Sequence, residues 1–157
     1  MKRTSTVNTR KKITSKYKFR SKFEKKVADE LTKYKVPFLY EARKIHYQYP
    51  VTCNPCSQCG NTVHFVTRVY TPDFLVNNEK TILEPKGRLT AKERRKFEWI
   101  LKSNPTIDLR LIFQRDNRIR PKSFVYYSDW AKKNNFTYIV GDKLPTNWIK
   151  EFHNGND

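Results

Sequence analysis

Residues 70–87, YTPDFLVNNEKTILEPKG, contain two short apolar runs separated by the polar stretch NNEK, and this pattern constrains the fold most. Apolar runs on either side of a turn-forming stretch predict a β-hairpin with its turn at residues 77–80. With the turn centred on residues 78–79, the numbers of opposed residues sum to 157, so Asp73 faces Glu84. Two carboxylates that face each other across a hairpin repel, so this hairpin requires a compensating cation or a solvent-exposed position.

Lys86 lies two residues after Glu84 and therefore on the same face of its strand. That face then carries two carboxylates and one ammonium group. A divalent cation turns the repulsion into ligation, because Mg²⁺ prefers one or two carboxylates and takes further ligands from water and substrate phosphate. Such a site supports phosphodiester hydrolysis. The spacing D-x₁₀-E-x-K is loose, and a solvent-facing, salt-bridged hairpin is the alternative that it leaves open.

The charge of the chain favours a polyanionic partner. Its 157 residues include 33 Lys and Arg against 15 Asp and Glu, which gives a formal net charge of +18 and a pI near 10.0. A surplus this large attracts DNA or RNA through counterion release. Aromatic residues make up 14% of the chain, whereas disordered polycations are poor in them. We predict one folded nucleic-acid-binding domain, with a merely basic or ribosome-like protein as the alternative.

The N-terminal segment is strongly basic. Nine Lys or Arg precede the first acidic residue, Glu24, so residues 1–18 are predicted to form a flexible arm that follows a phosphate backbone. An organellar transit peptide is the alternative. The chain then divides into a single domain at 19–152 and a tail at 153–157. No apolar run approaches a membrane span, and no secretory signal pattern opens the chain.

The remaining patterns predict an α/β (α+β) fold, with a mixed sheet flanked by helices. In chain order we expect a helix at 21–34, β-type runs at 38–49 and 63–70, the hairpin, a helix from 90 to 103, a strand at 108–113, a short helix from 128, a strand at 136–141 and a helix at 145–152. Ser21 and Glu24 fit a capping box, as do Thr90 and Glu93. Glu24 therefore has a structural role open to it as well as a catalytic one.

Several blocks together resemble a known family. The motif PD-x₁₀-E-x-K resembles the PD-(D/E)xK nuclease superfamily. With FRSKFEKKV at 19–27, YTPDFLV at 70–76, EPKG at 84–87, DLRLIF at 108–113 and DKLPTNWIKE at 142–151, the chain is similar to endonuclease I, the Holliday-junction resolvase family of T-odd phages. The similarity spans roughly residues 19–152, which is nearly the whole chain apart from the arm.

The resemblance implies a structure-selective endonuclease that uses Mg²⁺ or Mn²⁺ and acts on four-way junctions and other branched double-stranded DNA. It implies that Glu24, Asp73, Glu84 and Lys86 are catalytic, and that Glu24, Asp73, Glu84 and the backbone carbonyl of Pro85 bind metal. The family forms an intertwined homodimer in which the counterpart of Glu24 comes from one chain and the other three residues from its partner. A phage-encoded protein of this family acts in the host cytoplasm.

Two positions depart from the family pattern. Pro85 stands where the family usually has a residue with a backbone N–H, so one ladder hydrogen bond is lost and an edge-like position is expected. The cysteine-rich insert at 52–66 enlarges the segment that bridges the two halves of the family dimer.

The insert contains Cys53, Cys56 and Cys59 at C-x₂-C-x₂-C spacing, followed by His64. These four side chains provide a Cys₃His donor set, which suits structural zinc. Thiolates do not suit a hard catalytic ion, and an iron–sulfur cluster lacks a fourth cysteine. The alternative is three free thiols in a loop, because an odd cysteine count argues against a disulfide framework and for a reducing compartment.

Basic residues elsewhere are candidates for contacts with DNA phosphates, which position a duplex without reading its sequence. These residues are Arg20, Arg88, Lys92, Arg94, Arg95, Arg118, Arg120 and Lys122. For each one, a solvated surface position is the alternative. For the whole chain, two other functions remain open: a nicking or transposon-end endonuclease of the same superfamily, and a non-catalytic, zinc-stabilised nucleic-acid-binding module.

Overall fold

The computed structural model describes residues 16–55, 57–58, 60 and 62–154. Most of the predicted arm at 1–18 and the last residues of the predicted tail at 153–157 lie outside this description. Within it, no helix has the length and apolar character needed to cross a membrane.

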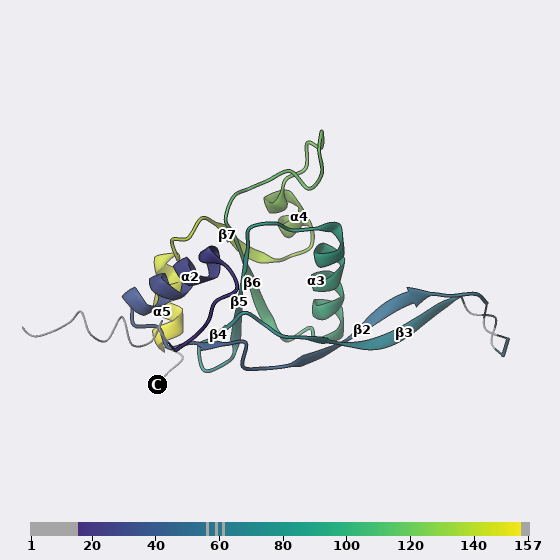
Figure 1. The fold of residues 1–157 in the computed structure, drawn as a ribbon, viewed down its shortest axis with the longest axis horizontal. Helices are drawn as coiled ribbons and strands as arrows, with labels where there is room; N and C mark the ends of the chain where they lie inside the picture. The colour runs from purple at the N-terminus through teal and green to yellow at the C-terminus, as the bar shows by residue number, and fades with distance from the viewer. Residues whose placement is uncertain (1–15, 56, 59, 61, 155–157) are drawn as a thin grey trace, which may run out of the picture.

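The order of helices and strands follows the sequence prediction, except that the β-type run predicted at 38–49 is divided between two strands, β1 and β2. The elements are α2 (Lys22–Lys33), β1 (Leu39–Tyr40), β2 (Ile45–Thr52), β3 (Val63–Tyr70), β4 (Phe74–Val76), β5 (Thr81–Lys86), α3 (Ala91–Ser103), β6 (Asp108–Phe113), α4 (Tyr127–Lys133), β7 (Thr137–Val140) and α5 (Thr146–Asn154). The predicted α+β class, a sheet flanked by helices, is confirmed (Figure 1).

The main sheet is mixed, with strand order β1-β4-β5-β6-β7. β4 and β5 form the predicted antiparallel hairpin, in which Phe74 pairs with Leu83 and Leu75 with Ile82. These numbers sum to 157, so the predicted register is confirmed. β5 and β6 are parallel and joined by α3, because parallel neighbours require a crossover rather than a tight turn. At the hairpin turn, Asn77, Asn78 and Glu79 all have positive φ, from 52° to 64°.

Each face of the sheet is covered by helices. Successive residues of a strand point to opposite faces, so Ile82 of β5 joins the cluster that contains α3 and α4, while Leu83 joins the cluster that contains α2 and α5. Figure 1 shows α2 and α5 on one side of the sheet and α3 on the other. The central strands β5 and β6 are thereby buried on both faces, which explains their near-continuous apolar runs.

The strands β2 and β3 form a separate two-stranded ribbon, with Ile45 paired to Tyr70 at the base and Thr52 to Val63 at the far end. Figure 1 shows this ribbon extending away from the body. The sequence pattern predicted both strands but not their separation from the main sheet. Their base packs on α3 through Ile45 and Tyr47, whereas Phe65 and Val69 are exposed.

Two helix starts use the predicted caps in different ways. Thr90 and Glu93 form a complete, reciprocal capping box at the start of α3. At α2 the Ser21 hydroxyl accepts a hydrogen bond from the Glu24 N–H, but the Glu24 carboxylate binds elsewhere. Glu24 is therefore only half of a capping box, and its side chain is directed toward other partners.

Candidate active site

Asp73, Glu84 and Lys86 converge at one end of the β4–β5 hairpin. Asp73 directly precedes β4, while Glu84 and Lys86 lie on one face of β5. The Lys86 Nζ lies 2.9 Å from Glu84 Oε1 and 3.7 Å from Asp73 Oδ2. The three side chains are only 13%, 2% and 16% exposed, respectively. The alternative of a solvent-facing, salt-bridged hairpin is therefore wrong.

The Glu84 carboxylate is held in place by two further donors. The Tyr70 hydroxyl donates to Glu84 Oε2 at 2.5 Å, and the Asp73 backbone N–H donates to the same oxygen at 3.2 Å. Burial and the neighbouring Glu84 charge raise the pKa of Tyr70 well above its ordinary value, so the hydroxyl remains a donor. A carboxylate with three donors around it has one defined orientation.

One buried carboxylate, Glu84, and one largely enclosed carboxylate, Asp73, face a single ammonium group, so the site is short of positive charge. Burial, and then the Glu84 carboxylate, raise the pKa of Asp73 from 3.8 to about 8, with smaller contributions from Glu24 and Glu41. Burial lowers the pKa of Lys86, but the Glu84 and Asp73 charges outweigh it, so this pKa lies above the ordinary lysine value. Lys86 therefore stays charged, and one negative charge of the pair is only partly compensated.

Glu24 reaches the same end of the sheet from α2. Its Oε2 accepts hydrogen bonds from the Tyr40 hydroxyl at 2.5 Å and from the Arg20 N–H at 3.1 Å. Tyr40 belongs to β1 and pairs with Phe74, the residue after Asp73. The four predicted catalytic residues thus lie near one another within a single chain.

These donors fit a hard divalent cation. Carboxylate oxygens are the ligands that Mg²⁺ and Mn²⁺ prefer, and a second cation relieves the repulsion that raises the pKa of Asp73. In the described part of the chain, no three His, Cys, Asp or Glu side chains already form a ready-made metal site. Instead Lys86 contacts both Asp73 and Glu84, while Tyr40 contacts Glu24.

Pro85 lies on an interior strand, but β4 ends before reaching it, so the edge-like position expected for Pro85 is confirmed on the β4 side alone. Pro85 pairs with Ile112 of β6, and β5 lies in the interior of the sheet. β4 is only three residues long, and its last pair with β5 is Phe74 with Leu83. Pro85 lies beyond that pair, so the β4 side of the strand needs no N–H from it.

Sequence reasoning missed four residues around the site. Tyr40 and Tyr70 hold the two glutamates, as described above. Glu93, predicted only as a cap, also lies 3.9 Å from the Lys86 Nζ. Lys96 places its ammonium 5.0 Å from the Tyr70 ring centroid, and burial lowers its pKa. Only Glu93 had a local signal, because the other contacts join elements that are distant in the sequence.

The candidate DNA-contacting residues fall into two groups. Arg88, Arg118 and Arg120 line one cavity near the start of α3. The other five do not line that cavity. Arg20 pairs with Glu41 at 2.8 Å, while Lys92 and Arg95 are exposed on α3 and Lys122 is exposed in the loop before α4. Arg94 Nη1 donates hydrogen bonds to the Leu89 and Ile119 carbonyls. Arg94 therefore has an internal bracing role in addition to any contact with DNA.

Two of the four candidate zinc ligands can be placed. Cys53 follows β2 and is exposed, and its N–H donates to the Thr62 carbonyl at 3.0 Å. His64 of β3 pairs with Val51 of β2, and Cys53 lies two residues after Val51. Cys53 and His64 are therefore diagonal neighbours on one face of the ribbon. Cys56 and Cys59 lie outside the described residues.

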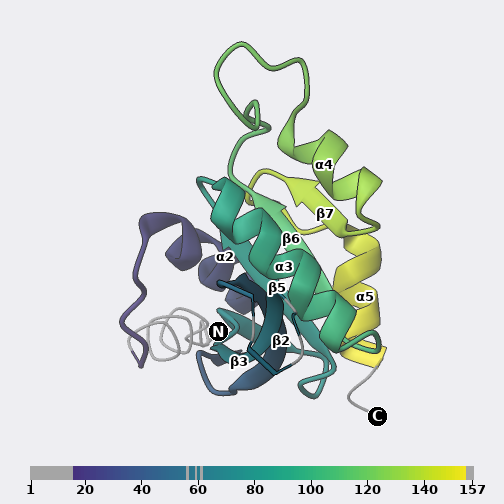
Figure 2. The same cartoon turned by 90° about the vertical axis from the view of Figure 1, so that its right-hand side faces the viewer.

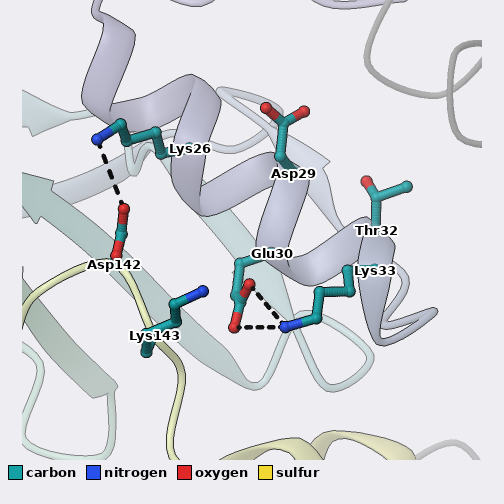
Figure 3. A pocket seen from close by; sticks show the side chains of 7 residues that line it. All are labelled: Lys26, Asp29, Glu30, Thr32, Lys33, Asp142 and Lys143. Atoms are coloured by element: carbon teal, nitrogen blue, oxygen red, sulfur yellow. Dashed lines mark hydrogen bonds and ion pairs between the residues drawn. The ribbon is translucent and has the colours of Figure 1, made fainter.

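A hollow of about 360 Å³ lies between α2 and the loop after β7 (Figure 3). Three lysines and three carboxylates are among its lining residues. Lys26 pairs with Asp142 at 3.6 Å and Lys33 with Glu30 at 3.3 Å. With charges of both signs paired across it, this hollow has no net attraction for a phosphate group.

The mixed sheet, with two buried carboxylates and a lysine on its central hairpin, has the arrangement expected of the PD-(D/E)xK nuclease class. The family model for phage endonuclease I matches residues 5–156. The chain therefore belongs to the phage endonuclease I family. It is 30% identical over 135 residues to "Endonuclease I" of Escherichia phage T7 and also to "Endodeoxyribonuclease 1" of Enterobacteria phage T3; the matched residues are 85% of this chain and 79% and 78% of those proteins.

The charge imbalance at Asp73 predicts a trade-off between stability and metal binding. The pKa of Asp73 is about 8 in the folded chain against 3.8 for an ordinary aspartate. The folded state therefore binds a proton that the unfolded state releases, and stability falls as pH rises from about 4 to about 8. We expect Asp73→Asn, in EDTA at pH 8.5, to raise the free energy of unfolding by at least about 1.4 kcal/mol, the equivalent of one pKa unit.

Urea unfolding at pH 5 and pH 8.5 measures this effect, and the gain is expected to be smaller at pH 5. The control is Asp29→Asn, because Asp29 is exposed on α2. An Asp73→Asn protein that is less stable than the wild type at pH 8.5 contradicts the charge imbalance.

Proposed function

We propose that this protein is a metal-dependent DNA endonuclease that resolves four-way (Holliday) junctions and other branched DNA. One observation carries the proposal: Asp73 and Glu84, which the resemblance implies are catalytic, lie in a largely enclosed group with Lys86 in contact with both. The +18 formal charge supports a DNA substrate, and so does the similarity to two phage endonucleases. The proposed setting is the cytoplasm of a phage-infected host cell.

Asp73, Glu84, the Pro85 carbonyl and Glu24 are the proposed ligands for Mg²⁺ or Mn²⁺. When bound, the ion would lower the pKa of water and stabilise the charge that builds on the phosphodiester. Tyr70 and Tyr40 keep the Glu84 and Glu24 carboxylates oriented, and the Glu84 Oε1 atom that contacts Lys86 has a second lone pair for a metal ion.

Lys86 supplies the fixed positive charge of the site. Its charged state is favoured by Glu84 and Asp73, and its low exposure strengthens its attraction for a phosphate oxygen. It is therefore proposed to orient the attacking water or to neutralise the scissile phosphate. Water adds to phosphorus as the bond to the 3′ oxygen breaks and that oxygen takes up a proton. The products are a 5′-phosphate and a 3′-hydroxyl.

We propose that the working form is a homodimer, because paired cuts in a four-way junction require two active sites. In the chain-swapped arrangement implied by the family, Glu24 would come from the partner chain. In the described chain, Glu24 already lies near its own Asp73, since its charge contributes to the raised pKa of that residue. Either origin of Glu24 supplies the same set of side chains.

The first test compares an end-labelled four-way junction with a linear duplex of matching sequence, in Mg²⁺. We expect paired cuts near the branch point and little cutting of the duplex. Glu84→Gln should reduce cleavage by at least about 100-fold, because it removes a proposed ligand charge. Binding to the junction should persist or tighten, since a negative charge near the phosphates is lost. Glu79→Gln, in the exposed turn of the same hairpin, is the matched control.

Each other outcome selects a different function. Equal cutting of junction and duplex would indicate another nuclease of the superfamily, such as a nicking or transposon-end enzyme. No cutting, with tight binding retained, would indicate a nucleic-acid-binding module. Full activity in Glu84→Gln would overturn the site assignment.

We also propose that the ribbon insert binds one structural zinc ion through Cys53, Cys56, Cys59 and His64. The placement of Cys53 and His64 on one ribbon face supports this proposal. Thiolate and imidazole donors suit zinc, which would stabilise an insert that is too polar to form a core.

Metal analysis of the purified protein should find about one zinc per chain, in agreement with one Cys₃His set. Cys53→Ser should remove it, while His46→Gln, a histidine on the opposite ribbon face, should retain it. Less than stoichiometric zinc in the wild type would exclude the site.

A further inference from the structure

A second cavity, of about 440 Å³, lies where the chain enters α3. One wall is the segment between β5 and α3, with Arg88 and Leu89, and the other is the loop between β6 and α4, with Arg118 and Arg120. Three arginines therefore line one cavity from two loops that are remote in the sequence. No carboxylate is among the lining residues.

The arginines lack the partners that usually compensate such a cluster. The three side chains are exposed, and among the described residues none of them forms an ion pair within the cavity. Arg118 contacts the Tyr126 side chain, with a hydrogen bond at 3.4 Å to its hydroxyl and a cation–π contact at 5.8 Å from its ring centroid. Like charges gathered without a counterion repel one another, and an anion in the cavity relieves that repulsion. The guanidinium group, with its planar set of N–H donors, matches a phosphate better than a lysine does.

The walls of the cavity are fixed to each other. The Leu89 N–H donates to the Tyr127 hydroxyl at 3.0 Å, and Arg94 Nη1 bridges the Leu89 and Ile119 carbonyls at 3.0 and 3.4 Å. The Ile119 N–H in turn donates to the Val125 carbonyl at 3.0 Å. The backbone that bears the arginines is thus held by hydrogen bonds, so less conformational entropy of the loops is lost when a ligand binds.

The cavity adjoins the proposed catalytic site along the chain. Arg88 follows Lys86 by two residues, and the Gln114 N–H, at the start of the other wall, donates to the Lys86 carbonyl at 2.9 Å. Both walls therefore leave the sheet beside Lys86. A DNA strand whose phosphate lies at Lys86 would carry its neighbouring phosphates past this cavity.

We propose that the cavity formed by Arg88, Arg118 and Arg120 binds one non-scissile backbone phosphate of the DNA strand that is cut. This inference rests on the proposed nuclease function. It assigns the three arginines a positioning role: they hold the strand in register with Asp73, Glu84 and Lys86, and they contact no reacting atom.

The test measures DNA binding in EDTA, so that cleavage does not enter. The substrates are junctions with one neutral methylphosphonate, moved stepwise along the strand that flanks the cut. For the wild type, the methylphosphonate at one position should weaken binding by about tenfold, which is equivalent to the loss of one charge-assisted hydrogen bond. In the double variant R118Q/R120Q, binding to unmodified DNA should weaken, and the slope of log K against log salt concentration should decrease in magnitude by about two. The same methylphosphonate should then have no further effect on binding by this variant.

The control is Lys150→Gln, which removes a positive charge from an exposed position on α5, on the other face of the sheet. It should keep the wild-type response to the methylphosphonate. If the double variant responds to every methylphosphonate as the wild type does, the cavity holds no phosphate, and this result is independent of cleavage. If the wild type binds as expected but cuts no DNA, the nuclease function fails while the phosphate site stands.

The tip of the same loop supports a second inference. Phe124 is 89% exposed, the highest value among the large apolar side chains of the described residues. Figure 2 shows the loop between β6 and α4 projecting beyond the rest of the body. Its base is closed by the bridge between Arg118 and Tyr126, and the Val125 N–H donates to the Ser123 hydroxyl at 3.0 Å. The phenyl ring is thus presented to solvent on a hydrogen-bonded turn.

An exposed aromatic ring with cations nearby in the same loop matches the surfaces on which unpaired bases stack. Arg118, Arg120 and Lys122 precede Phe124 in this loop and can neutralise the phosphates of a strand that carries such a base. We infer that Phe124 stacks on an unpaired or unstacked base at the branch point of the DNA. This contact would favour branched over fully paired DNA.

Binding of a branched DNA and of its linear duplex, measured in EDTA, gives the affinity ratio that tests this inference. Phe124→Ser should lower the ratio by about fivefold or more, and Phe124→Trp should preserve it, because stacking requires an aromatic face. Val125→Ser, at the adjacent exposed apolar residue, is the control and should leave the ratio unchanged. An unchanged ratio in Phe124→Ser would exclude the stacking role, whether or not the protein cuts DNA.

Discussion

The contact of Lys86 with two buried carboxylates is the interaction on which the rest of the site depends. Asp73 and Glu84 are placed opposite each other by the hairpin register, and the Lys86 ammonium group offsets part of their charge, while the raised pKa of Asp73 lets this residue hold a proton up to about pH 8. The raised pKa of Asp73 shows that one ammonium group does not complete the compensation. This residual imbalance costs the metal-free protein stability and favours a divalent cation in the same place.

The fold supports this group from both faces of the sheet. α2 brings Glu24 from one side, where Tyr40 of β1 holds it, and β3 brings Tyr70 from the other, where it binds Glu84. β6 runs parallel to β5 and ends beside Lys86. The two loops that leave this end carry the arginine cavity, so the proposed catalytic residues and the proposed phosphate contacts share one end of the sheet.

The β2–β3 ribbon carries the cysteine-rich insert at its far end. Its two strands pair with each other within one chain, which places Cys53 and His64 on a common face at the far end. The chain reversal at residues 53–62 lies in the cysteine-rich insert.

Local patterns in the sequence determined the hairpin register, the α3 cap and the shared face of Glu84 and Lys86. Each depends on residues a few positions apart, whose geometry follows from the two-residue period of a strand or from turn and cap chemistry. Only the tertiary structure decided which tyrosines hold the glutamates, that Pro85 lies inside the sheet and that Arg88 meets Arg118 and Arg120. Those contacts join segments that are distant in the sequence. They depend on strand order and helix packing, which cannot be deduced from the spacing of apolar residues within one helix or strand.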